Sequence, residues 1–298
     1  MSSTFDSGKA LGFFWDVFKA RPVAFIGMGI WTVALIAALG AAQYAPLMAY
    51  LQDSQTIAPD DTEALFASLA QFYGALGPIW LIGMVGGVLI EVAWLRLFVR
   101  GECTPAMPFR ISKDEGGYLL TMLALAGIML GAYIAWIIAM IVMGLVIGLA
   151  LSQFSAALAT VGIFVAIFTS ALPFLWLLVR LSPALALAVK RQAFALGDAW
   201  TGTKGWFWPM FGTYLIAYVV MLVLLLVIFA GAFLFGYDMT GISTTPAIMP
   251  ITGVVIFYAI QGAIMIIPQA MMRGIAVKAA LTIDEASPPK GEAATPTV

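Results

Sequence analysis

The sequence contains no histidine and a single cysteine, Cys103, and only 10% of its 298 residues are charged. Most zinc sites, histidine proton relays and Ser-His-Asp or Cys-His catalysis need histidine, so its absence argues against all of them. One cysteine cannot form an intrachain disulfide or a cysteine-rich metal site. The net charge of −1 gives no sign of nucleic-acid binding. We therefore expect a protein that is not an enzyme and that has no metal site, no cofactor and no nucleic-acid partner.

Apolar residues are what the chain has in excess: they make up 63% of it, and the mean hydropathy is +1.03. That composition leaves too little polar surface to cover a soluble globule of this length. A membrane-spanning helix needs about 20 mostly apolar residues, whereas barrel strands would be short and alternating. Six runs are long enough: 22–48, 72–99, 118–150, 159–188, 206–236 and 250–279. The fold class we predict is all-α, a polytopic membrane helical bundle with six transmembrane helices.

The connecting segments suggest three domains. We predict an N-terminal amphipathic segment over 1–21, a six-span membrane domain over 22–280 and a disordered tail over 281–298, whose composition is typical of disorder. The first external loop, 49–71, is acidic, and Asp60 is expected to cap a short helix that leads into the second span. In the loop over 101–117, the Gly116-Gly117 pair is expected to break helices.

Two stretches have the pattern of amphipathic helices that lie in the headgroup layer, at about 10–20 and 190–203. The second belongs to a central stretch, 180–212, that separates two long apolar runs. Indole rings and lysines prefer the boundary between water and hydrocarbon. We expect the following residues to be membrane-interface anchors: Trp15, Lys19, Trp200, Lys204, Trp206 and Trp208.

The basic residues predict the orientation. With six spans, all fourteen Lys and Arg residues fall on one side of the membrane or at that side's helix ends. Cytoplasmic loops carry such an excess of basic residues. We therefore expect both termini in the cytoplasm and a bacterial inner-membrane location.

Glu91 is the one ionisable residue well inside an apolar run, and it is costly to bury there. We expect it to face the bundle and to pair with an arginine. Arg96 lies about 140° around the same helix, so the partner should come from another span, with Arg180 as the first candidate and Arg273 as the second. The pair is either a structural ion pair, which we favour, or part of a proton-coupled or substrate-contacting site.

Three segments resemble a bacterial inner-membrane family known as the glycerophosphodiester phosphodiesterase membrane domain, or as YciC-like proteins. They read WDVFKARPVAFIG, VRLSPALALAV and AWTGTKGWFWPMFGTYL. The resemblance implies a helical membrane module of unassigned role. It does not imply phosphodiesterase activity, because that activity belongs to a separate soluble barrel domain with metal-binding carboxylates and histidines.

The function that we expect is that of a non-catalytic membrane module, an accessory or scaffold for a membrane complex or for lipids. Membrane lipids and other membrane proteins are the expected partners. The alternative is a small-solute or lipid transporter that uses Glu91 and the spans interrupted by Pro78, Pro173 and Pro268. A membrane enzyme ranks last, because no nucleophile with an activating base is visible.

Overall fold

A computed structural model describes residues 4–58, 61–102, 113–234 and 251–286 of the chain. Over these residues the structure is all-α, with nine helices and no strand. Six helical segments are long and apolar enough to cross a membrane, so the predicted class, a polytopic membrane helical bundle, is confirmed. By the length and apolar composition of these segments, the protein is a multi-pass membrane protein.

The chain forms two compact units rather than the single membrane domain predicted over 22–280. Unit 1 consists of Met1–Ala10, Ile111–Tyr214 and Ile275–Val298, and unit 2 consists of Leu11–Arg110 and Leu215–Gly274. Three helices contribute residues to both units: α1 (Ser7–Ala20), α8 (Phe207–Leu234) and α9 (Ile251–Ala286).

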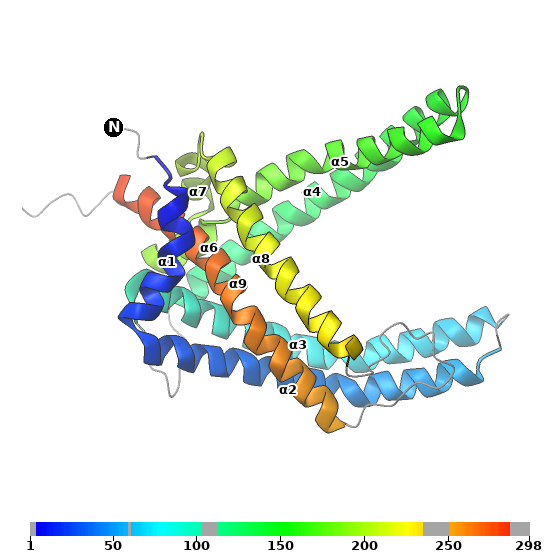
Figure 1. The fold of residues 1–298 in the computed structure, drawn as a ribbon, viewed down its shortest axis with the longest axis horizontal. Coiled ribbons are helices and arrows are strands. Elements are labelled where there is room, and N and C mark those ends of the chain that lie inside the picture. Colours follow the sequence, from blue (N-terminus) through cyan, green and yellow to red (C-terminus); the bar gives the residue numbers. More distant parts are fainter. Residues whose placement is uncertain (1–3, 59–60, 103–112, 235–250, 287–298) are drawn as a thin grey trace, which may run out of the picture. The chain divides into compact units, whose positions relative to one another are not determined.

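In unit 2, α2 (Pro22–Thr56) and α3 (Thr62–Arg100) form a hairpin and run side by side (Figure 1). Pro22 begins α2 at a position where its missing N–H costs nothing. Gly101 ends α3 with a left-handed φ of 68°, and its N–H donates to the carbonyl of Leu97. At 1.5 Å per residue each helix is more than about 50 Å long, which exceeds a hydrocarbon core of about 30 Å.

The connection between α2 and α3 is shorter than the predicted loop over 49–71, because α2 continues to Thr56 and α3 begins at Thr62. The predicted helix start is present, but its cap is Asp61: the Oδ1 atom accepts the N–H of Ala64 at 2.9 Å. Asp60, the predicted cap, lies outside the described residues.

Unit 1 contains the hairpin of α4 (Lys113–Ser152) and α5 (Ala156–Leu181), which lie side by side (Figure 1). Ser155 caps α5 by accepting the N–H of Leu158 at 3.2 Å. Across the hairpin, the indole Nε1 of Trp136 donates to the Ser170 hydroxyl at 3.0 Å.

The Gly116-Gly117 pair does not break a helix, since α4 already begins at Lys113. Gly117 instead allows another segment to approach closely: a Cβ added there would lie 3.1 Å from the backbone nitrogen of Ala193. The missing side chain serves packing at this position, which a pattern of helix breakers cannot reveal.

The prediction of one continuous amphipathic helix over 190–203 was wrong. The chain forms two short helices here, α6 (Ala184–Arg191) and α7 (Leu196–Gly202), and the apolar run predicted over 159–188 falls within the candidate span Ala156–Arg191, which includes α5 and α6. Gln192 has a left-handed φ of 53°, and the N–H of Ala193 donates to the carbonyl of Ala188, the pattern of a Schellman end.

The helix α6 lies in the core of unit 1. Its residues Ala184, Ala186, Leu187, Ala188 and Val189 are fully buried. Their apolar side chains stabilise the packing of unit 1, which explains why the hydrophobic pattern of this stretch continued without a visible break.

The disordered tail predicted over 281–298 was wrong for its first six residues, because α9 extends to Ala286. Ile283 is buried at 3% exposure and packs so close to Gly202 that a Cβ on the glycine would lie 2.7 Å from it. Burial of this side chain and a charge pair made by Asp284 hold the end of the helix in unit 1.

Candidate functional site

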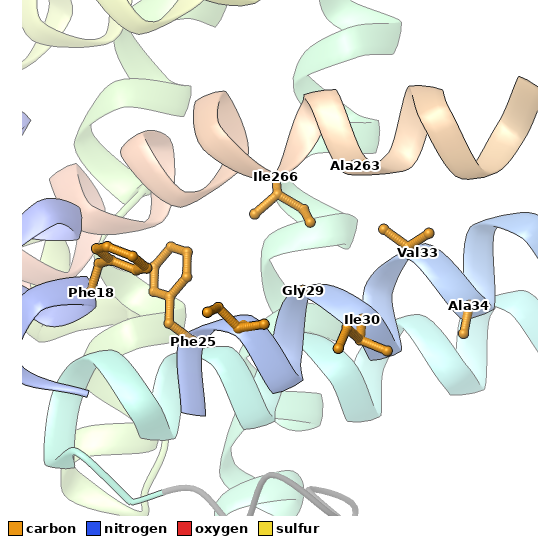
Figure 2. A pocket seen from close by; sticks show the side chains of 9 residues that line it. Phe18, Phe25, Gly29, Ile30, Val33, Ala34, Ala263 and Ile266 are labelled. Carbon is orange, nitrogen blue, oxygen red and sulfur yellow. The ribbon is translucent and has the colours of Figure 1, made fainter. Parts of the chain in front are cut away.

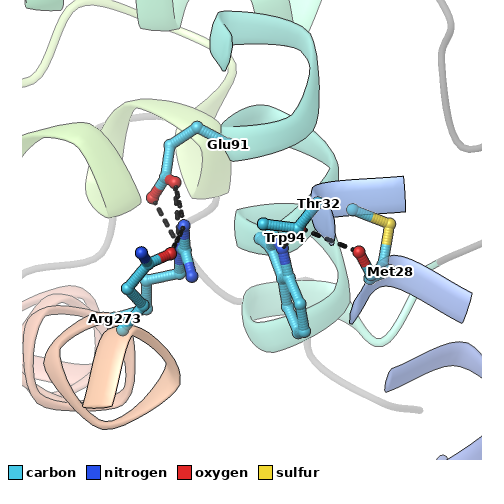
Figure 3. A network of polar contacts seen from close by, with 6 residues as sticks. Met28, Thr32, Glu91, Trp94 and Arg273 are labelled. Atoms are coloured by element: carbon cyan, nitrogen blue, oxygen red, sulfur yellow. Dashed lines mark hydrogen bonds and ion pairs between the residues drawn. The ribbon is translucent and has the colours of Figure 1, made fainter. Parts of the chain in front are cut away.

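Unit 2 contains an ion pair between Glu91 on α3 and Arg273 on α9 (Figure 3). Arg273 Nε donates to both carboxylate oxygens, at 3.0 and 2.9 Å, and its Nη2 donates to Oε2 at 2.6 Å. The Glu91 side chain is 28% exposed and that of Arg273 is 14% exposed. An arginine fork on a carboxylate is both strong and geometrically specific.

The arginine side chain is positioned by two further groups. The Arg273 guanidinium lies over the ring of Trp94, 5.3 Å from its centroid. The amide oxygen of Gln269, one turn earlier on α9, accepts from Arg273 Nη2 at 3.5 Å. These contacts fix the orientation of the guanidinium that Glu91 binds.

Trp94 extends the network to α2 (Figure 3). Its Nε1 donates to the Thr32 hydroxyl at 3.0 Å, and that hydroxyl donates to the carbonyl of Met28 at 2.9 Å. Trp94 and Met28 are fully buried. One continuous set of contacts therefore joins α2, α3 and α9 within unit 2.

The prediction of an arginine partner from another span is confirmed, but the first candidate was wrong. The partner is Arg273, and Arg180 has other contacts, all within unit 1. Arg96, on α3 with Glu91, is buried at 3% exposure. The pairing depends on which helices pack together, and their packing is not encoded in the spacing of charges along the chain.

In unit 1, Arg180 at the end of α5 lies between two tryptophans. Its guanidinium carbon is 5.0 Å from the ring centroid of Trp176 and 4.0 Å from that of Trp200. Arg180 Nη2 also donates to the carbonyl of Trp200, and Nε donates to the Thr203 hydroxyl at 3.5 Å. We call Trp176, Arg180, Trp200 and Thr203 the arginine–tryptophan cluster. It attaches α7 to the end of α5.

A second charged site of unit 1 joins three elements through Arg191, the last residue of α6. Its Nε donates to Asp284 on α9 at 2.7 Å, and its Nη1 donates to Asp198 on α7 at 2.7 Å. One guanidinium thus holds two carboxylates. Both acids come from segments that we expected to be a surface helix and a disordered tail.

The predicted interface anchors have different surroundings. Trp15 is 48% exposed, stacks on Phe18 at 5.0 Å between ring centroids, and has the Lys19 ammonium 5.5 Å from its ring. Trp208 is 73% exposed, and Lys204 is exposed as well.

The other two tryptophans are half-buried. Trp206 packs against Phe5 at 5.8 Å between centroids, and Trp200 belongs to the arginine–tryptophan cluster. Their rings contact protein, so Trp200 and Trp206 contribute to the packing of unit 1.

Five residues of these sites were not predicted from the sequence: Trp94, Thr32, Gln269, Arg191 and Asp284. Two of these could have been found from helical spacing: Trp94 lies three residues after Glu91, and Gln269 four residues before Arg273, so each shares a face with its charged neighbour. The others join segments far apart in the sequence, for which the chain contains no local signal.

Among the described residues, no group of three or more acidic or cysteine side chains lies where it could hold a metal ion. Comparisons of the chain with protein-family models, with curated proteins and with solved structures found no match.

Proposed function

We propose that the protein is a non-catalytic integral membrane module, an accessory or scaffold protein that organises lipids around a membrane complex. The observation that carries this proposal is that each unit contains a basic side chain over a tryptophan ring, and in both units the tryptophan belongs to a short helix. In unit 2 the ammonium of Lys19 lies over Trp15 on α1. In unit 1 the guanidinium of Arg180 lies over Trp200 on α7.

Both sites occur next to the end of a spanning helix, where headgroups and hydrocarbon meet. Tryptophan prefers that boundary, and basic side chains there attract anionic lipids by about 1 kcal/mol each. In unit 2, Lys19 lies three residues before Pro22, where α2 begins. In unit 1, Arg180 occupies the last turn of α5. This placement favours recognition of lipid headgroups.

The charges of unit 2 also support a structural role. Both oxygens of Glu91 accept hydrogen bonds from Arg273, and the guanidinium is held in turn by Trp94 and Gln269. A carboxylate that takes part in transport must change its partners during each cycle, whereas a bidentate arginine fork that is itself held by two further groups keeps the carboxylate in one geometry. The Glu91 pair is therefore better suited to holding α3 against α9 than to proton-coupled transport.

Location and orientation are part of the proposal. The distribution of the fourteen Lys and Arg residues supports cytoplasmic termini. The resemblance to the glycerophosphodiester phosphodiesterase membrane domain, or YciC-like, family supports a bacterial inner membrane. In that orientation Lys19 and Arg180 both face the cytoplasmic leaflet, whose surface is negative.

The proposal is tested by reconstituting the protein in sealed vesicles of phosphatidylethanolamine and phosphatidylglycerol. Native mass spectrometry of the protein extracted from them should show phosphatidylglycerol enriched over its share of the mixture. The same vesicles, loaded with a pH-sensitive dye, should show no proton flux above that of protein-free vesicles. Proton or solute flux that Glu91→Gln abolishes would establish the transporter instead. Retained lipid with the composition of the vesicle would also contradict the proposal.

A further inference from the structure

A groove runs between α2 and α9 within unit 2, with a volume of about 480 Å³, and every residue that lines it is apolar (Figure 2). That volume lies within the range of small-ligand sites, about 300–1,000 Å³. Val33 on α2 and Ile266 on α9 point into the space between the two helices (Figure 2). Phe18, the one lining residue from α1, lies at one end beside Phe25, 5.4 Å away between ring centroids.

The other end is closed because α2 and α9 touch there. A Cβ added to Gly40 would lie 2.2 Å from the ring of Tyr258, and one added to Gly262 would lie 3.5 Å from the Cα of Val33. The groove therefore ends where the two helices converge, and Phe18 lines its opposite end. Its residues from Phe25 to Ala34 cover about 14 Å of helix at 1.5 Å per residue. That length is close to half of a hydrocarbon core of about 30 Å, the depth of one leaflet.

The end of the groove that Phe18 lines has a positive charge beside it. Lys19 follows Phe18 directly in α1 and is exposed, and its ammonium lies 5.5 Å from the Trp15 ring. Trp15 stacks on Phe18, so the aromatic side chains continue from the groove to the lysine. The groove is therefore apolar and about as long as one leaflet is deep, and a cation and an indole lie beside the end that Phe18 lines.

We propose that this groove binds one acyl chain of an anionic phospholipid from the adjoining leaflet, with the headgroup phosphate on Lys19. The inference rests on the proposed function and names its ligand. An acyl chain fits a lining without polar groups, and the groove's depth matches the leaflet in which such a chain already lies. The chain gains little from leaving bulk lipid, so close packing between the helices and the charge at Lys19 supply the preference.

Two lining alanines make the groove testable without disturbing the core. Ala34 on α2 and Ala263 on α9 are both exposed, so a larger side chain there fills the groove rather than a packed interior. Ala38 is a matched control, because it is exposed on α2 one turn beyond Ala34 and does not line the groove. For the headgroup, Lys19→Gln is compared with Lys9→Gln, a substitution of the exposed cation ten residues earlier on α1.

The experiment measures retained lipid by native mass spectrometry, with phosphatidylglycerol or phosphatidylcholine added to the detergent-purified chain. Wild type and Ala38→Phe should retain one phosphatidylglycerol that Ala34→Phe and Ala263→Phe both lose. Lys19→Gln should weaken phosphatidylglycerol binding about fivefold, the effect of one basic residue. The same substitution should leave phosphatidylcholine unchanged, and Lys9→Gln should behave as wild type. Thermal unfolding of each variant checks that it is folded.

Equal retention by wild type and both groove-filling variants would overturn the site. If the protein still enriched phosphatidylglycerol in that case, the proposed function would stand and the lipid would bind elsewhere. Loss of lipid in the groove-filling variants with no effect of Lys19→Gln would refute the headgroup assignment. The absence of any anionic-lipid enrichment in wild type would refute the function and the site together.

Discussion

Replacement of Glu91 by glutamine tests whether the ion pair of unit 2 holds the fold together. The substitution preserves the size of the side chain but removes the charge, so Arg273 keeps a buried positive charge without its counter-ion. Removal of one member of a buried pair costs about 3–5 kcal/mol. The Glu91 side chain is 28% exposed, and Arg273 keeps its contact with Trp94, so solvent and the ring compensate part of the loss. We expect a destabilisation of about 2 kcal/mol.

Unfolding in mixed micelles, titrated with a denaturing detergent and followed by tryptophan fluorescence, measures this difference. A second substitution, Arg273→Gln, makes a double-mutant cycle. Glu91→Gln with Arg273→Gln removes both charges, and replacement of a whole buried pair is often close to neutral. The double variant should therefore recover more than half of the loss. The matched control is Glu91→Gln with Arg180→Gln, which should recover nothing, because Arg180 binds in the arginine–tryptophan cluster of unit 1.

Two outcomes would refute the reasoning. If Glu91→Gln unfolds at the same detergent concentration as wild type, the pair does not stabilise the fold. If the losses from Glu91→Gln and Arg273→Gln simply add, the two side chains are not coupled in the folded protein. Unchanged stability together with a lost proton- or solute-dependent signal is the pattern that a transporter predicts.

Two further predictions concern packing and orientation. Gly40→Ala should destabilise the protein by about 1–3 kcal/mol, because the added Cβ would lie 2.2 Å from the Tyr258 ring. The control Gly87→Ala, whose Cβ would have no atom within 4 Å, should leave stability unchanged or slightly raised. Equal effects of the two substitutions in the same unfolding titration would contradict the close approach of α2 and α9. Cys103, which lies outside the described residues, should be inaccessible to an impermeant thiol reagent in intact cells, and labelling from outside a sealed membrane would reverse the proposed orientation.

The sequence alone predicted the fold class and all six spans, because hydrophobicity is a property of each residue and a span needs only an uninterrupted run of about 20. It also predicted that Glu91 requires an arginine, since an unpaired charge in hydrocarbon is costly wherever the helices lie. The N-terminal cap of α3 was predicted to within one residue, because the capping side chain and the N–H that donates to it are only three positions apart.

Only the tertiary structure decided which residues meet. Arg180 and Arg273 occupy similar positions in their spans, and it is the packing of α9 in unit 2 that selects Arg273. The sequence pattern predicted Gly117 as a helix breaker, whereas in the structure the backbone of Ala193 packs closely against it. The helical turn around Asp284 likewise depends on a contact with a distant segment, the ion pair with Arg191. The physical reason is that close packing and the pairing of buried charges determine these contacts. Both depend on distances between chain segments, and a local sequence pattern contains no information about those distances.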